Sequence, residues 1–216
     1  MLSLAVMAAV MSSCSEEERD ISGIVAEMCM MPTKEGGVIS YVVTDDNRNL
    51  SLQSPIKVAW AQKADTTYRA LLYYRNVEGN IMPYSAQQVL LLKPKKEEQL
   101  KEMADAADPL ALVSAWYAKN GKFLNLAIDV KTGEKEGDDK RHVLALLKDT
   151  VFSSHEGKKY CYRILYSRNG MPEYYTVRTY FSIPVEDIAE GDTLQLQIPE
   201  KSGMLIKDLK KVGQDI

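Results

Sequence analysis

This sequence of 216 residues contains no long apolar run and only two histidines. Its apolar stretch at residues 2–11 has about half of the roughly 20 residues that a membrane-spanning helix needs, so it cannot cross a bilayer. His142 and His155 lie in no His-x-x-x-His or Cys-x-x-Cys arrangement, and no P-loop or dinucleotide fingerprint occurs. We therefore expect no metal site and no cofactor.

An excess of positive charge is also absent. The 27 lysines and arginines are outnumbered by 30 aspartates and glutamates, which gives a net charge of −3. Single-stranded nucleic acid needs a basic groove in addition to stacking aromatic rings. The tyrosines within residues 36–94 therefore do not suffice, and we expect no nucleic-acid partner.

Cysteine is scarce, with three in the chain. Cys14 follows the apolar run and two small residues, Ser12 and Ser13, in a pattern that resembles a lipobox. We predict that residues 1–13 are a signal peptide and that Cys14 is the lipid attachment site. The acyl chains attached there would anchor the protein in the membrane. No Lys or Arg precedes the apolar run, although signal peptides carry positive charge there. This indicates that the true start lies upstream of Met1.

The four residues after Cys14 are small or acidic. They resemble the acidic tetrad that carries lipoproteins of the Bacteroidetes to the outer face of the outer membrane, and a plain solvated tether is the alternative. The predicted surface-export signal consists of Ser15, Glu16, Glu17 and Glu18. The predicted location is the outer membrane, with a lipid anchor and the protein at the cell surface.

The other two cysteines, Cys29 and Cys161, are far apart in the sequence. A disulfide is allowed outside the cytoplasm, but two isolated positions do not show whether the residues meet. Cys29 lies among Met28, Met30 and Met31, and soft sulfur ligands suit Cu(I). The apolar residues beside this cluster favour a buried strand instead.

The N-terminal half is predicted to be a small β domain. Residues 14–35 form a tether and a first strand, and residues 36–94 alternate β-prone stretches with turn clusters. Strands expected at 38–44, 50–53, 58–61, 67–74 and 88–93 suit a small OB-like barrel. The acidic turn at 45–49 lacks the glycine and the distal glutamate of an EF-hand loop, so we predict a turn and not a calcium site.

The C-terminal half is predicted to be an antiparallel β-sandwich over residues 108–200. A short helical connector at 95–107, between Pro94 and Pro109, precedes it. Strands are expected at 110–117, 123–130, 142–148, 160–167, 174–183 and 193–198, and turn signals separate them. We expect 160–167 and 174–183 to pair as a long hairpin. For the tail at 201–216, the sequence is compatible with either a closing strand or a frayed helix. The fold class is therefore all-β.

Tyrosines concentrate in that expected hairpin. Aromatic rings and an arginine on one exposed sheet face would stack on a sugar or anchor a partner protein. The alternative is that the same tyrosines are half-buried and paired across strands. The candidate binding face consists of Tyr160, Tyr162, Tyr166, Tyr174, Arg178 and Tyr180. Replacing Tyr162, Tyr180 and Arg178 is expected to abolish partner binding without unfolding the protein.

Catalytic motifs are missing. Ser153, Ser154 and His155 are neighbours in the chain, but neighbouring side chains rarely face one another and no Gly-x-Ser-x-Gly elbow is present. Asp138 and Asp139 are paired acids of the kind that glycosidases use, but their Lys- and Gly-rich surroundings favour a solvated loop. We predict no catalytic residue and no enzymatic activity.

Several segments together resemble one family. Residues 108–116 (DPLALVSAW), 121–126 (GKFLNL) and 142–148 (HVLALLK) are similar to the C-terminal domain of NigD-like lipoproteins, and residues 44–52 and 89–93 resemble that family's N-terminal OB-fold domain. With the lipobox, the resemblance covers nearly the whole chain in the same order. It implies an OB-like barrel and a β-sandwich on an anchored protein, and it provides no catalytic residues to transfer.

We therefore expect a lipid-anchored, non-enzymatic binding or accessory protein whose partner is an outer-membrane protein or a glycan. One alternative is a bacteriocin-related immunity or secretion accessory, suggested by the locus from which the family takes its name. Another is a surface polysaccharide hydrolase that uses Asp138 or Asp139 as acid or base.

Overall fold

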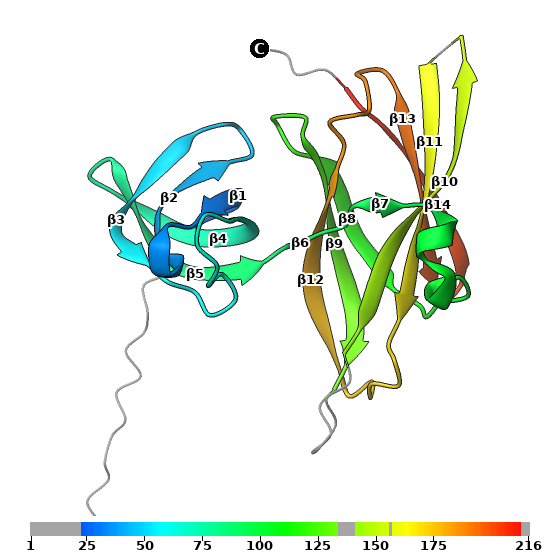
Figure 1. Cartoon of the computed structure of the whole chain (residues 1–216), viewed down its shortest axis with the longest axis horizontal. Helices are drawn as coiled ribbons and strands as arrows, with labels where there is room; N and C mark the ends of the chain where they lie inside the picture. The colour runs from blue at the N-terminus through cyan, green and yellow to red at the C-terminus, as the bar shows by residue number, and fades with distance from the viewer. Residues whose placement is uncertain (1–22, 134–140, 156, 213–216) are drawn as a thin grey trace, which may run out of the picture.

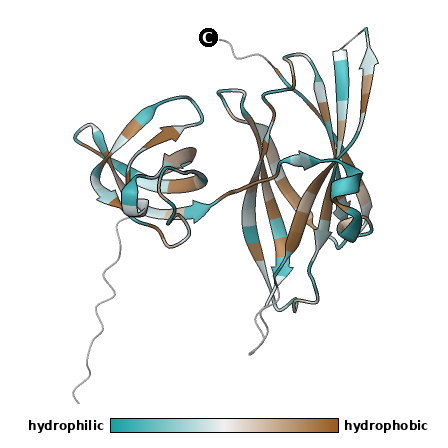
Figure 2. Cartoon of the chain, in the orientation of Figure 1, coloured by the Kyte–Doolittle hydropathy of each residue, from teal (hydrophilic) through white to brown (hydrophobic). Residues whose placement is uncertain are grey.

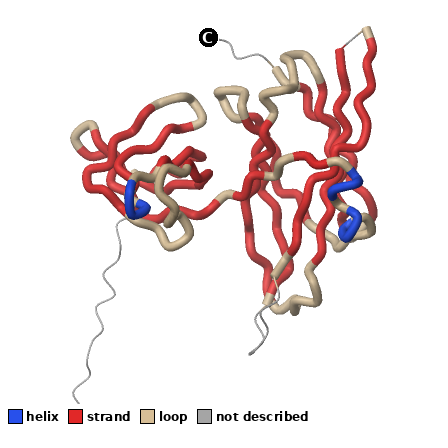
Figure 3. The backbone as a smooth tube through the Cα atoms, viewed as in Figure 1, coloured by secondary structure: helices blue, strands red, loops and turns tan. Residues whose placement is uncertain are grey.

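The computed structural model describes residues 23–133, 141–155 and 157–212. These residues form two β domains that lie side by side (Figure 1). The helical segments of this part of the chain are short 3-10 turns, drawn in blue in Figure 3: η1 (Glu35–Gly37), η2 (Glu97–Gln99) and η3 (Lys101–Met103). The predicted all-β fold class is confirmed.

The N-terminal domain is a closed five-stranded barrel with the order β1-β2-β3-β5-β4. Antiparallel pairing of β4 with β1 closes it. Alternate residues of each strand point inward, and Cys29, Leu72 and Ile81 are buried there. The OB-like prediction is therefore confirmed. The strands are β1 (Val25–Pro32), β2 (Ile39–Thr44), β3 (Asn49–Ile56), β4 (Thr67–Val77) and β5 (Asn80–Gln88).

The C-terminal domain is a two-layer sandwich. One sheet has the order β14-β13-β11-β10-β7 and the other has the order β6-β12-β9-β8. Apolar residues from both inner faces form one core, and Figure 2 shows brown and teal segments alternating along the strands. The strands are β6 (Leu90–Leu91), β7 (Pro94–Lys95), β8 (Ala111–Tyr117), β9 (Phe123–Thr132), β10 (Val143–Ser154), β11 (Gly157–Ser167), β12 (Tyr175–Pro184), β13 (Thr193–Glu200) and β14 (Gly203–Lys210).

The pairing of strands differs from the sequence prediction in one important respect. β11 pairs with β10 and β13, whereas β12 pairs with β9 and β6 in the other sheet. The expected hairpin of 160–167 with 174–183 is therefore wrong. A turn does occur between them, with the Met171 amide donating to the Arg168 carbonyl at 3.0 Å, but the chain crosses to the opposite layer after it.

Three other segments also differ from expectation. Residues 58–61 form a turn and not a strand, and β5 covers residues 80–88, for most of which no strand was predicted. Of the strand expected at 88–93, Gln88 ends β5 of the barrel, and Leu90 and Leu91 form β6 of the sandwich. The expected helical connector consists of η2 and η3, where Leu100 packs against Ala145 and Leu165 of the sandwich. The C-terminal tail contributes the closing strand β14.

A small apolar cluster joins the two domains. Because side chains alternate along a strand, Leu71 points out of the barrel, opposite to Leu72, and it packs with Met28 and Val89. Tyr180 of β12 packs against the same cluster from the sandwich. The outward face of β4 is therefore the interface between the domains.

The same face of β4 carries Arg69, whose side chain is fully shielded from solvent. Its guanidinium donates to both carboxylate oxygens of Asp45, at 2.5 and 2.6 Å. Nη2 also donates to Asn125 Oδ1 at 3.0 Å, and Nε donates to Ser182 Oγ at 3.2 Å. The guanidinium carbon lies 4.2 Å from the centre of the Phe123 ring. One buried barrel cation is thus held by three sandwich residues.

The partners of Arg69 are bonded to one another as well. Asn125 Nδ2 donates to Asp45 Oδ2 at 3.0 Å, and Ser182 Oγ donates to Asn125 Oδ1 at 2.7 Å. The Asn120 amide donates to the Asp45 carbonyl at 2.6 Å, which ties the β8–β9 turn to the β2–β3 turn. A fully satisfied buried network of this kind fixes one relative orientation of the elements that carry it.

Replacing Arg69 with Met should destabilise the protein by about 3–5 kcal/mol, because it leaves Asp45 charged and partly buried without its cation. Trp60 lies in the barrel and Trp116 in the sandwich, so urea unfolding followed by tryptophan fluorescence reports on both domains. The exposed pair of Arg48 with Glu27 is the control, and Arg48→Met should cost about 1 kcal/mol or less. Equal losses in the two variants would contradict a special role for Arg69.

Candidate functional site

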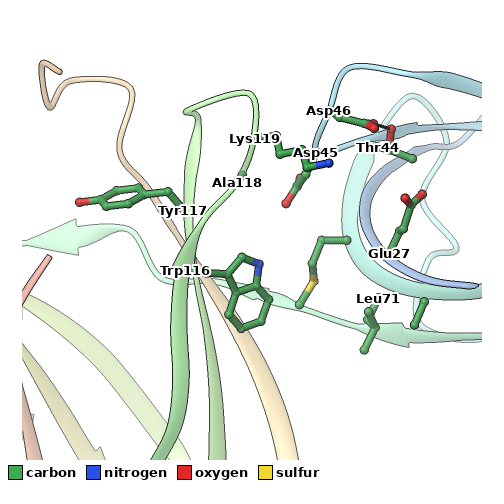
Figure 4. A pocket seen from close by; sticks show the side chains of 11 residues that line it. Glu27, Thr44, Asp45, Asp46, Leu71, Trp116, Tyr117, Ala118 and Lys119 are labelled. Carbon is green, nitrogen blue, oxygen red and sulfur yellow. Dashed lines mark hydrogen bonds between the residues drawn. The ribbon is translucent and has the colours of Figure 1, made fainter. Parts of the chain in front are cut away.

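A cleft of about 250 Å³ opens between the barrel and the sandwich, beside the Arg69 network. Its barrel wall comes from β1, β4 and the β2–β3 turn, and its sandwich wall comes from β8 and the β8–β9 turn (Figure 4). The lining residues are Ala26, Glu27, Met28, Thr44, Asp45, Asp46, Leu71, Trp116, Tyr117, Ala118 and Lys119. Both predicted turns, at 45–49 and 119–122, border this cleft.

Trp116 supplies the aromatic wall of the cleft. Its side chain projects from β8 toward the barrel, whereas Tyr117 points the opposite way (Figure 4) and donates its hydroxyl to the Leu209 carbonyl at 2.9 Å. Trp116 is 37% exposed although it borders a domain interface. Within the described part of the chain its indole nitrogen has no hydrogen-bond partner, so both the ring face and this donor are available to a ligand.

Carboxylates line the opposite wall, and each is held in place. Glu27 accepts a hydrogen bond from the Tyr74 hydroxyl at 2.7 Å and another from Arg48 at 2.5 Å. Asp46 accepts from Arg48 Nε at 2.7 Å and from the Thr44 hydroxyl. Because Glu27 and Asp46 are bonded to residues of the barrel, their carboxylates are fixed in place where they border the cleft.

The charges around the cleft balance. The carboxylates of Glu27, Asp45 and Asp46 are matched by Arg48, Arg69 and the lining residue Lys119. The hydroxyl of Thr44 is the main cause that lowers the pKa of Asp46 to about 2, with the contacts of Arg48 as a further cause. Asp46 is therefore ionised at any physiological pH. The cleft and its surroundings therefore combine fixed carboxylates and an aromatic ring with equal numbers of positive and negative side chains.

The predicted tyrosine face is not one surface. Tyr162 and Tyr166 are buried in the sandwich core, and Tyr160 packs against that core. Tyr180 is half-buried at the domain interface. Even-numbered residues of β11 do share a face, as expected, but that face points inward. Replacing Tyr162 would therefore remove core packing, so the expected triple variant would not leave the fold intact.

The two remaining members of that set are exposed, and one of them, Arg178, lies two residues from Tyr180 on the outer face of β12. Tyr174 is 73% exposed just before β12, and its ring lies close to Gly133. Arg178 forms a bidentate pair with Asp129 on β9, at 2.8 and 3.0 Å. These two residues lie on the outer side of the four-stranded sheet and outside the cleft.

The other residues singled out from the sequence either lie outside the described part of the chain or are buried cysteines. Cys14, Ser15, Glu16, Glu17, Glu18, Asp138 and Asp139 lie outside the described residues. Cys29 and Cys161 are free thiols buried in different domains, and burial raises the pKa of Cys29 to about 12. Among the described residues, no group of three or more His, Cys, Asp or Glu side chains is placed to hold a metal ion.

Sequence reasoning did not single out the residues that build the cleft. Arg69 is the one charged residue in an otherwise apolar or aromatic stretch at 68–74. This position in the sequence indicates that Arg69 is buried and paired with an acid. Trp116 lies on an edge strand between the half-buried Ala115 and Tyr117. Because side chains alternate between the two faces of a strand, a Trp116 ring opposite to these two residues is expected to point away from the sandwich core. Asp45 and Asp46 were noted only as turn residues.

Comparison with known proteins gives a consistent result. A family model described as the NigD-like C-terminal beta sandwich domain matches residues 91–207. No match is found among curated proteins. Among the described residues, no helix is long and apolar enough to cross a membrane.

Solved structures from the Bacteroides group share the two-domain fold. A NigD-like immunity protein of Bacteroides caccae is 20% identical with a TM-score of 0.64, over 86% of this chain and 91% of that one. A Parabacteroides distasonis protein provisionally described as toxin-related is 16% identical with a TM-score of 0.62, over 89% and 94%. A Bacteroides fragilis protein provisionally described as a lipoprotein is 11% identical with a TM-score of 0.57, over 89% and 99%.

The lowered pKa of Asp46 predicts a pH dependence. Its folded pKa of about 2 lies below its ordinary 3.8, so the stability that it contributes is present above about pH 4 and is lost as the pH falls toward 2. Because Asp46 lies near the surface, that contribution should be about 1 kcal/mol or less. In Asp46→Asn, the free energy of unfolding measured with urea should therefore fall less steeply between about pH 4 and pH 2 than in the wild type.

Removing the donor should have a related effect. Thr44→Val deletes the hydroxyl that bonds to Asp46, so carboxyl NMR titration should show the Asp46 pKa moving back toward 3.8. An Asp46 pKa that stays at its wild-type value in this variant would mean that Arg48 alone lowers it.

Proposed function

The chain belongs to the NigD-like family, and on this premise we propose that it is a lipid-anchored, non-enzymatic binding protein of the outer membrane that faces the cell surface. Its cleft binds one sugar ring of a surface glycan. The observation that carries the proposal is the partly exposed ring of Trp116, which borders a cleft between the domains whose lining also includes the fixed carboxylates of Glu27, Asp45 and Asp46.

The chemistry of the cleft favours a neutral, hydroxyl-rich ligand. Sugars present an apolar C–H face that packs on an aromatic ring and several hydroxyl donors that suit carboxylate acceptors. A cationic side chain from a protein would need a negative field, but Arg48, Arg69 and Lys119 neutralise the three acids. At about 250 Å³ the cleft is slightly smaller than the roughly 300–1,000 Å³ of sites for whole small molecules. It therefore suits one ring of a larger chain.

The state of the acids supports binding without turnover. A glycosidase needs one carboxylic acid that stays protonated at working pH because its pKa is raised. Thr44 and Arg48 hold the pKa of Asp46 at about 2, and both oxygens of the Asp45 carboxylate accept hydrogen bonds from Arg69. A general acid for glycoside hydrolysis is therefore not provided by these residues.

The anchor is supported by the lipobox at Cys14 and by the B. fragilis relative described provisionally as a lipoprotein. A glycan-binding cleft on an anchored protein also requires that the protein faces outward, which the acidic residues 15–18 would provide.

A second candidate is a role in protection against a bacteriocin. It is favoured by the description of the B. caccae relative as an immunity protein. Under this proposal, deletion of the gene would raise sensitivity to a toxin from a neighbouring strain, and unchanged sensitivity and unchanged toxin export would remove it.

Glycan-array binding by the full-length chain tests the cleft. Trp116→Ala should reduce binding at least tenfold, because it removes the stacking face while leaving the Arg69 network in place. Tyr174→Ala is the matched control, since Tyr174 is an exposed aromatic outside the cleft, and it should bind like wild type.

Two results would reject the glycan. The first is equal binding by the Trp116 and Tyr174 variants. The second combines two observations: the protein does not bind to the array, and a crosslinker placed at position 119 captures a protein in cells. If that capture is lost in the Trp116 variant, the partner is a protein and not a glycan.

Membrane fractionation tests the anchor separately. Cys14→Ser should release the protein from the membrane fraction, because it removes the thiol that carries the diacylglycerol. Glu16→Ala, Glu17→Ala and Glu18→Ala combined should keep the protein in the membrane but protect it from protease added to intact cells. Surface digestion at the wild-type rate would identify residues 15–18 as a tether only.

A further inference from the structure

The sandwich contains a second hollow, which is separate from the cleft and has no charged side chain among the described residues that line it. It measures about 540 Å³, within the roughly 300–1,000 Å³ of small-molecule sites. It lies between the two sheets, where the inner face of β12 continues beyond the packed core. Leu90, Val143 and Val177 line it and are 48%, 41% and 40% exposed. Apolar side chains left exposed in a concave site are a mark of ligand binding.

A hydrogen-bonded relay joins the two sheets inside this hollow. His142 Nδ1 lies 2.7 Å from the Tyr166 hydroxyl, and Nε2 lies 3.0 Å from Thr132 Oγ1. The His142 and Tyr166 rings are stacked, with centres 5.7 Å apart. Both ring nitrogens of His142 therefore have hydrogen-bond partners within the sandwich.

The direction of the relay follows from burial. Tyr166 is 1% exposed and burial raises its pKa to about 12, so the hydroxyl keeps its proton. Among the described residues His142 Nδ1 is the hydrogen-bond partner of this hydroxyl, and a buried hydroxyl proton needs an acceptor, so we assign the tautomer in which Nδ1 accepts. Burial and the positive charge of Arg168 lower the pKa of His142, so the imidazole is neutral and its Nε2–H donates to Thr132. The Thr132 oxygen accepts this hydrogen bond through one lone pair, so the Thr132 hydroxyl can still donate its own proton to a ligand.

We propose that this hollow binds a neutral, largely apolar small molecule that carries a carbonyl or ether oxygen, and that the Thr132 hydroxyl donates to that oxygen. The described residues that line the hollow include no aspartate, glutamate, lysine or arginine, so an ionic ligand would lose its hydration without gaining a partner among them. Two exposed valines and a leucine cover the apolar body of the ligand, and the threonine fixes its orientation. This site is independent of the glycan cleft.

Fluorescence titration with prodan tests the proposal. Prodan is a neutral naphthalene with one ketone, and its emission moves to the blue in an apolar site. The full chain carrying Cys14→Ser avoids the need for detergent. We expect saturable binding with a Kd of roughly 1–100 μM. Thr132→Val should weaken it about 2–12-fold by removing one hydrogen bond, whereas Thr132→Ser should bind like the parent.

A matched pair of variants locates the probe. Val177→Trp fills the hollow from an exposed position and should weaken binding at least tenfold, with unchanged far-ultraviolet circular dichroism. Val151 is an equally exposed β-strand valine, at 39%, outside the hollow, and Val151→Trp should bind like the parent. Absence of saturable binding by the parent, or equal binding by the two tryptophan variants, would overturn the proposal.

Discussion

The arrangement of this molecule depends on one buried cation. Arg69 and its counter-ion Asp45 both belong to the barrel, but the other groups that contact the guanidinium, Asn125, Ser182 and the Phe123 ring, belong to the sandwich. The buried pair is therefore fully hydrogen-bonded only when the domains meet in one orientation. A buried polar network of this kind specifies the geometry of an interface, because any other orientation would leave some of its members without partners.

The cleft is a consequence of that constraint. The Asp45 turn touches the Asn120 turn at one end of the interface, and the Leu71 cluster closes the other. Between these two contacts the domain surfaces diverge, and Trp116 lies in the space that remains. Because every carboxylate on the facing wall is already bonded, a ligand meets acceptors that need no reorganisation. Such pre-organisation lowers the cost of binding.

Local features of the fold were predictable from the sequence, because they depend on neighbouring residues. The alternation at 123–130 marks β9, and the polar cluster at 45–49 marks the β2–β3 turn. Pairing partners were not predictable in the same way. The alternation of Tyr160, Tyr162 and Tyr166 shows that they share a face, but it does not show which face is covered. The Asn169–Gly170 signal fixes a turn and not the sheet to which the next strand belongs.

Strands β6 and β7 lie directly after the barrel, yet their partners β12 and β10 come 52 or more residues later in the chain. A polypeptide that emerges from its N-terminus can close the barrel first, because all five barrel strands precede β6. Strand β7 can pair once β10 is available, but β6 has no partner before β12. Ser182, on the same strand β12, is also the last residue of the Arg69 network in the chain. Docking of the two domains therefore cannot be complete before β12 is in place.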